Sequence, residues 1–232
     1  MEIIAEIGQN HNGNMGLARQ LIAEAKTAGA TVAKFQVYSA RALFPKEGNE
    51  WFDYNCKTEL TRDAVEALAR ECQDQGIEFM ASVFDVERVA WLEAVGVRRY
   101  KIASRSVRDQ TLIDAVAKTG KPVIVSLGMW NAPEFPMIDV PGGVGYLYCV
   151  SKYPTELADL NLAEVDFTRY LGFSDHTIGI DAPMIALSRG ARVIEKHFTL
   201  DKTMFGPDHS GSMTPAELAA LSRFRDNLAV AL

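Results

Sequence analysis

The chain has 232 residues, 48% of them hydrophobic and 23% charged, with a formal net charge of −6 and a pI near 5.3. This composition supports a sizeable core and argues against a disordered chain, and its acidic balance argues against nucleic acid or an anionic membrane as the main partner. No apolar run reaches the ~20 residues of a membrane span, and the start at Met1 lacks the features of a secretory signal. The three widely spaced cysteines fit neither a disulfide framework nor a zinc motif. We expect one cytoplasmic domain over residues 1–232.

Eight short apolar runs are typical of β-strands. They are Ile3–Ile7, Val32–Gln36, Ile77–Ser82, Tyr100–Ala103, Val123–Ser126, Gly145–Cys149, Tyr170–Phe173 and Arg192–Ile194. Helical patterns follow most of them, at about Gly16–Ala28, Thr61–Gln75, Val86–Val95, Asp109–Lys118, Ile180–Ser188 and Pro215–Val230. Strands that alternate with helices favour βαβ units and a parallel sheet. In this length, the pattern predicts a compact (β/α)₈ TIM barrel, with a doubly wound open sheet as the second interpretation.

The ends of the helices carry matching signals. A glycine follows a helical stretch and precedes a strand five times, at Gly29, Gly76, Gly96, Gly120 and Gly190. Glycine suits the left-handed position just past a helix, from which a short loop can enter the next strand. Two helix starts are also marked, one by a threonine cap at Thr61 and one by Thr214 before a first-turn proline.

Two of the expected units look irregular. The long connection between residues 35 and 60 contains the aromatic segment Trp51–Tyr54, which fits either a contact between subunits or a lid over a substrate. Between strands five and six, the segment 131–143 holds three prolines, which oppose a full helix. We therefore expect a degenerate fifth helix.

Polar side chains gather at the predicted carboxyl ends of the strands, where a barrel builds its active site. In chain order they are Glu6, Lys34, Gln36, Ser82, Lys101, Ser104, Ser126, Ser151, Tyr153, Ser174, His176 and His197. Strand interiors normally favour packing residues, so this concentration is informative as a set. The opening loop 9–14 is polar as well, and fits an Asx-rich turn that caps the first helix as well as it fits a substrate role.

Lys34 and Lys101 are embedded in apolar strands. A lysine buried without an anionic partner would be costly or forced neutral. Together with Ser82, Ser104 and the other serines, the two lysines favour a phosphate or carboxylate pocket. The alternatives are that each ammonium extends to the rim, or that one lysine forms a Schiff base as in class I aldolases.

His176 and His197 each follow a predicted strand, and a helix lies between them. Two imidazoles at neighbouring strand ends predict a divalent-metal site, whereas each ring taken alone is also explained as a satisfied polar residue in a loop. Asp208 and His209, in a turn after the eighth strand, are close enough in sequence to reach the same site.

Eight stretches resemble those of the sialic acid synthase family, the phosphoenolpyruvate-dependent nonulosonate synthases. They occur in family order over essentially the whole chain. The stretches are Ala5–Gly13, Lys34–Gln36, Tyr100–Ser104, Ser126–Met129, Tyr153–Thr155, Gly172–Thr177, Glu195–Thr199 and Gly206–Asp208.

The resemblance implies a condensation of phosphoenolpyruvate with an open-chain amino sugar of the N-acyl-mannosamine type, releasing phosphate and a nine-carbon 2-keto acid. It further implies that His176 and His197 bind a divalent metal, usually manganese, with magnesium or cobalt as alternatives, and that Glu6 manages a water or a proton. The residues implied to hold phosphoenolpyruvate are Lys34, Ser82, Lys101, Ser104, Ser126 and Ser174, and those implied to contact the sugar are Gln36, Tyr153 and Asp208. The family also implies a homodimer.

The chain departs from the family pattern in places. Typical members carry a C-terminal antifreeze-like domain that reaches the partner's site, whereas this sequence ends just after the eighth helix. Ser106 stands where a glutamate is usual, and Ser151 where an asparagine is usual. Two alternatives follow: a catalytically weak binding barrel that needs a separately encoded antifreeze-like partner, and a metal-dependent aldolase or sugar-phosphate isomerase on the same fold.

Overall fold

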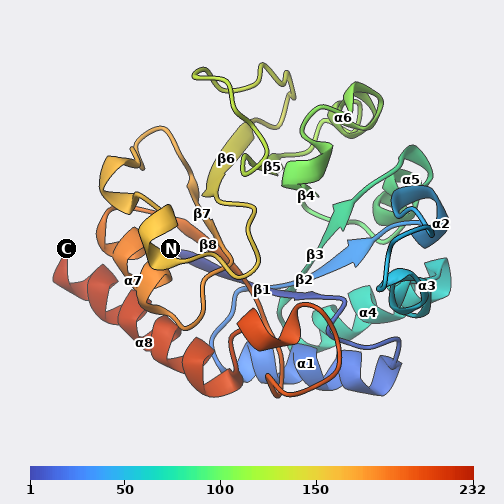
Figure 1. Ribbon diagram of the computed structural model, residues 1–232, viewed down its shortest axis with the longest axis horizontal. Coiled ribbons are helices and arrows are strands. Elements are labelled where there is room, and N and C mark those ends of the chain that lie inside the picture. The colour runs from blue at the N-terminus through green and yellow to red at the C-terminus, as the bar shows by residue number, and fades with distance from the viewer.

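The computed structural model describes residues 1–232, in which eight parallel strands form a closed barrel in the order of the sequence (Figure 1). This confirms the predicted (β/α)₈ barrel and excludes the open sheet. The strands are β1 (Glu2–Gly8), β2 (Val32–Val37), β3 (Glu78–Val83), β4 (Tyr100–Ile102), β5 (Val123–Ser126), β6 (Val144–Cys149), β7 (Gly172–Asp175) and β8 (Val193–His197).

Six helices cover the outside of the barrel, and their bounds lie within one residue of those predicted. They are α1 (Met15–Thr27), α4 (Arg62–Gln75), α5 (Val86–Ala94), α6 (Gln110–Ala117), α7 (Asp181–Ser188) and α8 (Pro215–Ala231). The Thr61 side chain accepts a hydrogen bond from the Ala64 N–H, and Thr214 forms a capping box with Glu217. The five glycines predicted to end helices all have a positive φ.

The outer ring of helices is incomplete at two places. The loop between β5 and β6, at the top of Figure 1, contains no helix, which confirms the degenerate fifth unit. The segment after β6 has no α-helix either, but two 3-10 turns, η2 (Leu157–Asp159) and η3 (Leu162–Glu164). The long connection after β2 forms two short helices, α2 (Ala40–Leu43) and α3 (Phe52–Thr58). Membrane-spanning helices are absent, since none is both long and apolar enough.

Strands β7 and β8 extend further toward their carboxyl ends than predicted. Tyr170, the predicted start of the seventh strand, lies in a turn in which its N–H donates to the Asp166 carbonyl. The eighth strand continues past Ile194, because Glu6 of β1 pairs with His197. The polar residues at these ends therefore lie inside strands, where their side chains alternate between the two faces of the sheet.

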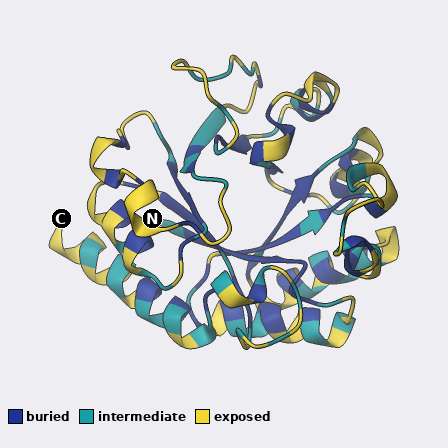
Figure 2. Ribbon diagram, in the orientation of Figure 1, coloured by how far each residue is buried: buried dark blue, intermediate teal, exposed yellow.

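Alternation of the strand side chains gives the barrel two separate apolar regions. One face of each strand packs against the helices in a large core that includes Ile3, Ala33 and Phe35. The other face points into the barrel, where a second, smaller cluster of buried side chains fills the middle. Its members are Ile4, Val32, Met80, Ile124, Leu147 and Val193. Most strands are buried in Figure 2, although β6 is largely intermediate, and the exposed residues lie on the outer helices and loops.

Candidate active site

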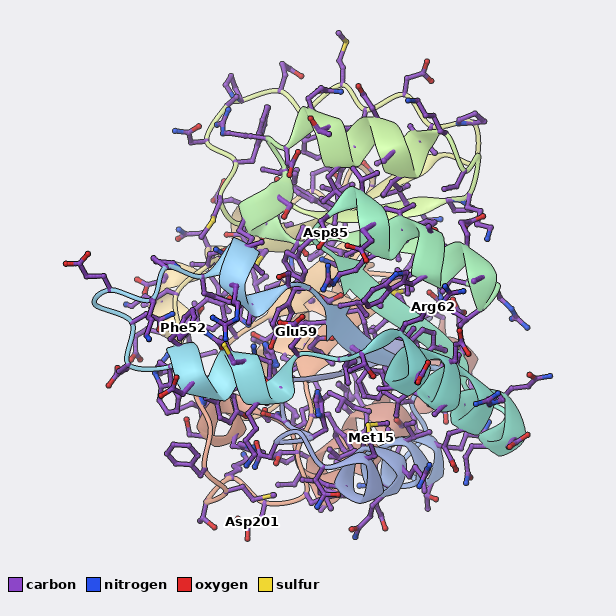
Figure 3. All side chains as sticks on the ribbon, turned by 90° about the vertical axis from the view of Figure 1, so that its right-hand side faces the viewer. Met15, Phe52, Glu59, Arg62, Asp85 and Asp201 are labelled. Carbon is purple, nitrogen blue, oxygen red and sulfur yellow. The ribbon has the colours of Figure 1, made fainter.

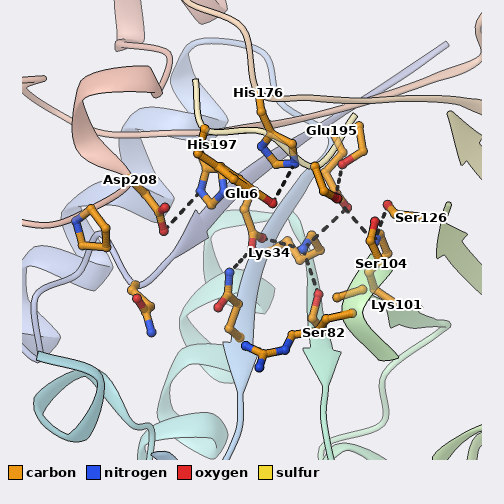
Figure 4. A pocket seen from close by; sticks show the side chains of 18 of the residues that line it. Glu6, Lys34, Ser82, Lys101, Ser104, Ser126, His176, Glu195, His197 and Asp208 are labelled. Atoms are coloured by element: carbon orange, nitrogen blue, oxygen red, sulfur yellow. Dashed lines mark hydrogen bonds and ion pairs between the residues drawn. The ribbon is translucent and has the colours of Figure 1, made fainter. Parts of the chain in front are cut away.

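A cavity of about 660 Å³ opens at the carboxyl ends of the strands (Figure 4). Every residue to which the sequence assigned a catalytic, substrate-binding or metal-binding role lines this one cavity, whereas His209, the other histidine near the predicted metal site, does not. These residues are Glu6, Lys34, Gln36, Ser82, Lys101, Ser104, Ser126, Tyr153, Ser174, His176, His197 and Asp208. Four of them lie two positions after a residue of the inner apolar layer on the same strand: Glu6 after Ile4, Lys34 after Val32, Ser82 after Met80 and Ser126 after Ile124. The alternation of the strand therefore directs these four side chains into the cavity.

Lys34 and Lys101 end inside the cavity. Each residue is at most 2% exposed, which excludes the alternative in which the ammonium groups extend to the rim. The Lys34 ammonium lies 2.7 Å from a carboxylate oxygen of Glu6 and donates to the Ser82 hydroxyl at 3.0 Å. The Lys101 ammonium donates to the Ser126 hydroxyl at 2.8 Å. The two lysines thus stand beside protein hydroxyls and carboxylates.

Glu195 joins the two lysines and was given no role in the site from the sequence, although it begins one of the stretches that resemble the family. Its carboxylate lies 3.5 Å from the Lys34 ammonium and 3.6 Å from that of Lys101, and it accepts a hydrogen bond from the Ser174 hydroxyl at 2.9 Å. The prediction ended the eighth strand at Ile194 and so placed Glu195 in a loop. The signal was present in the alternation of Val193, Glu195 and His197, which share one face of β8.

Asp175 and Lys196 follow the opposite alternation from Ser174 and Glu195. The Lys196 ammonium lies 2.6 Å from the Asp175 carboxylate, with both side chains at most 1% exposed. Lys196 also donates to the Thr177 carbonyl. Two of these four polar residues therefore form a buried ion pair of their own.

Burial and neighbouring charges shift the pKa values of the lysines and of Glu195 in the cavity. Burial alone lowers the pKa of Lys34, but the carboxylates of Glu195 and Glu6 outweigh burial and raise it above its ordinary value. Burial lowers the pKa of Lys101, with Glu195 opposing only in part. Burial alone would raise the pKa of Glu195, yet the two ammonium groups lower it to about 2. Glu195 is therefore ionised at neutral pH.

The two imidazoles lie side by side at the ends of β7 and β8, with ring centroids 5.6 Å apart. Burial, together with the neighbouring His197, lowers the pKa of His176 well below its ordinary value, so this ring is neutral. The Nδ1 atoms of both rings are buried and have no hydrogen-bond partner. A carboxylate oxygen of Asp208 lies 3.8 Å from Nδ1 of His197.

These features fit a divalent cation. Neutral imidazole is a common ligand for borderline metals, and two buried, unpartnered ring nitrogens have a cost that a metal would remove. No group of three or more His, Cys, Asp or Glu side chains forms a ready metal centre in the chain. A cation held by the histidine pair would take further ligands from water or substrate.

The side of the cavity predicted to contact sugar is less buried. The Tyr153 hydroxyl lies 3.2 Å from Nε2 of His176, and the Tyr153 side chain is largely exposed at the rim. Gln36 donates to the Glu6 carboxylate at 3.0 Å. On the side predicted to hold phosphoenolpyruvate, the Ser104 hydroxyl accepts a hydrogen bond from the Gly128 N–H at 3.0 Å. Each of these groups has one polar partner and further hydrogen-bonding capacity.

The opening loop is mainly structural. Asn14 caps α1 by accepting hydrogen bonds from the N–H groups of Gly16 and Leu17. Asn10 is fully buried and donates to the Phe198 carbonyl and the Ser212 hydroxyl. Of this loop, only Gln9 lines the cavity.

The two departures from the family pattern lie in different surroundings. Ser151 lines the cavity, whereas Ser106 is buried in the 3-10 turn η1 (Ser104–Ser106) and does not. The serine at position 106 therefore does not change the residues that line the cavity, whereas the serine at position 151 does.

The aromatic segment after β2 packs against this same chain. Trp51 lines the cavity, and its ring lies 5.7 Å from that of Tyr54 and 5.5 Å from that of Phe205. In Figure 3, α3 with Phe52 lies next to Glu59, on the side of the barrel that α4 covers. The segment thus joins the loop after β8 over one side of the cavity, as a lid would.

The comparisons with known proteins agree with this geometry. The NeuB family matches residues 21–232. The N,N'-diacetyllegionaminic acid synthase of Legionella pneumophila is 35% identical over 94% of this chain and 69% of its own length. The human N-acetylneuraminate-9-phosphate synthase is 33% identical over 95% of this chain and 68% of its own length. The crystal structure of the N-acetylneuraminic acid synthetase of Leptospira borgpetersenii superposes with a TM-score of 0.91 at 35% identity, covering 99% of this chain and 84% of that one. The chain belongs to the NeuB family.

Proposed function

We propose that this protein condenses phosphoenolpyruvate with an open-chain N-acyl amino sugar of the mannosamine type, giving a sialic-acid-like nonulosonic acid and phosphate. The observation that carries the proposal is the single cavity in which a lysine, glutamate and serine cluster adjoins two imidazoles whose Nδ1 atoms have no hydrogen-bond partner. Membership of a family whose named relatives are nonulosonic acid synthases supports it.

Phosphoenolpyruvate fits the lysine side of the cavity. Its phosphate and carboxylate are anionic, and Lys34 and Lys101 are buried cations next to serine hydroxyls that can donate. Ser82, Ser104, Ser126 and Ser174 surround this side. Glu195 holds the two ammonium groups in place before the substrate arrives, so that little reorganisation accompanies binding.

The sugar aldehyde belongs beside the histidine pair. A divalent cation held there, manganese by our proposal, would polarise the aldehyde oxygen as a Lewis acid. Gln36, Tyr153 and Asp208 lie around this end of the cavity and can hydrogen-bond sugar hydroxyls. The bond then forms between C3 of phosphoenolpyruvate and the aldehyde carbon.

Glu6 is placed to handle the water that completes the reaction. As the carbon–carbon bond forms, C2 becomes electron-deficient, adds water, and then expels phosphate to give the keto acid. The Glu6 carboxylate, held by Lys34 at 2.7 Å and by Gln36 at 3.0 Å, lies on the path between the lysine side and the histidine pair. We assign it the role of orienting this water and accepting its proton.

The test is phosphate release from phosphoenolpyruvate with manganese and a panel of hexosamines, including N-acetylmannosamine and its 6-phosphate. We expect release only when a suitable acceptor is present, and loss of release in Lys101→Met but not in the exposed control Lys26→Met. No release over the panel by folded, metal-loaded protein would contradict the proposal. Turnover of sugars without phosphoenolpyruvate would instead support a metal-dependent aldolase or isomerase.

A further inference from the structure

One cation in the cavity has no counterion. Lys34, Lys101 and Lys196 each have a carboxylate oxygen within 3.6 Å. Arg105 also lines the cavity and forms no ion pair with any Asp or Glu within 4.0 Å. Lys34 and Lys101 are thus paired with Glu6 and Glu195, whereas Arg105 has no carboxylate at ion-pair distance.

Arg105 is held across the mouth of the cavity. It belongs to η1, directly after Ser104 at the end of β4, while its guanidinium reaches α2 in the connection after β2. There it lies 5.1 Å from the centre of the Phe44 ring, and Nη2 donates to the Leu43 carbonyl at 3.3 Å. A guanidinium has five N–H donors, so most of them remain available to a ligand.

We propose that Arg105 binds an anionic group of the substrate, a phosphate or a carboxylate. The planar guanidinium matches such oxygens in pairs, and the cavity wall against Phe44 fixes its plane. The identity of the ligand rests on the proposed function, which offers two sources: the phosphate and carboxylate of phosphoenolpyruvate, and a phosphate carried by the acceptor sugar. The human relative is named for a 9-phosphate product, so the second source has chemical precedent among proteins similar to this one.

Arg108 offers a matched control. It lies three residues further along, stacks 4.6 Å from the Trp130 ring and donates to the Asn131 side chain at 2.8 Å. Its surroundings therefore resemble those of Arg105, but it does not line the cavity. A purely structural role for Arg105 predicts similar behaviour of the two variants.

The first experiment uses calorimetry with inorganic phosphate on the full chain as wild type, Arg105→Gln, Arg105→Lys and Arg108→Gln. Loss of charge-assisted hydrogen bonds should weaken phosphate binding at least about tenfold in Arg105→Gln. Arg105→Lys should fall between it and wild type, because a point charge replaces the fork. Arg108→Gln should match wild type. Equal phosphate affinity of Arg105→Gln and wild type, or no phosphate binding by wild type, would overturn the proposal.

The second experiment separates the two sources. Phosphoenolpyruvate is titrated alone, and N-acetylmannosamine and its 6-phosphate are then compared as acceptors with phosphoenolpyruvate saturating. Weaker phosphoenolpyruvate binding in Arg105→Gln assigns Arg105 to that substrate, whereas a raised KM for the phosphorylated sugar alone assigns it to the acceptor. Phosphate binding that depends on Arg105 without any turnover would keep the anion site and refute the proposed reaction. Turnover by wild type, with no effect of Arg105→Gln on the binding or KM of either substrate, would keep the proposed reaction and refute the anion site at Arg105.

Discussion

The two ends of the barrel interior both carry charged side chains, but they differ in how completely those charges are satisfied. At the amino ends of the strands, which we call the closed end, Arg99 lies between Glu2 and Glu78. It donates four hydrogen bonds of 2.8–3.1 Å to their carboxylates. At the carboxyl ends, which we call the open end because the cavity lies there, an oxygen of Glu195 and the Nδ1 atoms of His176 and His197 have no hydrogen-bond partner.

This difference separates a structural cluster from a binding one. The guanidinium fork of Arg99 uses four of its five N–H donors on two carboxylates, so little of it is left for a ligand. Ammonium groups are point charges that leave neighbouring oxygens unsatisfied until another group arrives. Because an apolar layer, which includes Ile4, lies between the two ends, substitutions at one end should not affect the other.

The largest effect is expected at the histidine pair. His197→Ala should weaken manganese binding by more than about a hundredfold, since removal of even an outer-shell partner of a metal costs 10- to 100-fold. Turnover should disappear with the metal, and the metal-free protein should lose little stability. Metal content and thermal unfolding of the purified variant provide the measurement.

His209 is the matched control for this prediction. It is fully buried, with Nδ1 2.6 Å from the Thr199 hydroxyl and Nε2 3.2 Å from the Asn12 side chain, so neither nitrogen is free for a metal. His209→Ala should keep its manganese but unfold about 1–3 kcal/mol more easily, because buried partners are left unsatisfied. Manganese lost by His209→Ala and kept by His197→Ala would refute the ligand assignment.

The next effect compares one glutamate from each end. Glu195→Gln leaves Lys34 and Lys101 with less negative charge, and should lower the free energy of unfolding by about 3 kcal/mol. Inorganic phosphate should raise the melting temperature of Glu195→Gln more than that of wild type, because an anion can replace the lost carboxylate. Glu78→Gln, at the closed end, should show no such additional rescue.

The response of these two variants to phosphate tests whether the two ends of the barrel differ as ligand sites. Phosphate rescue of both variants, or of neither, would mean that the open end is no more a ligand site than the closed end. The measurement is the melting temperature of Glu195→Gln, Glu78→Gln and wild type over a phosphate titration, with chloride at the same ionic strength as the control.

The fold followed from local patterns, and the site followed in part. Each strand, helix and glycine signal is contained within one short segment of the chain, and the closed barrel requires only that the units repeat. Lys34 and Lys101 stood out because a charge is unexpected in an apolar strand. Their carboxylate partner Glu195 did not, since its importance depends on two strands far away in the sequence.

The features that were missed share this dependence on distant parts of the chain. The environment of His209 is set by Asn12, 197 residues away. The extension of β8 depends on its pairing with β1, and the pairing of Lys196 with Asp175 follows from that extension. Arg105 was not singled out, because its lack of a counterion emerges only once the three lysines of the cavity are seen to have one.

A smaller effect is expected at the closed end. Arg99→Gln should lower the free energy of unfolding by about 1–2 kcal/mol, a figure reduced because Glu2 is partly exposed to solvent. The kinetic constants and the metal content should not change. A change in KM for either substrate would show that the apolar layer does not isolate the two ends.

The smallest effect concerns the lid that only the open end possesses. Trp51→Ala removes contacts with Tyr54 and Phe205, each worth about 0.5–1.5 kcal/mol. If the segment closes over the acceptor, the KM for the sugar should rise about twofold to tenfold, while phosphoenolpyruvate binding and the oligomeric state stay as in wild type. Phe52 is already buried in α3, so Trp51 is the cleaner substitution. Light scattering that shows a wild-type dimer and a Trp51→Ala monomer would instead make the segment a subunit contact. In that case the open end would be completed by a second copy of the chain.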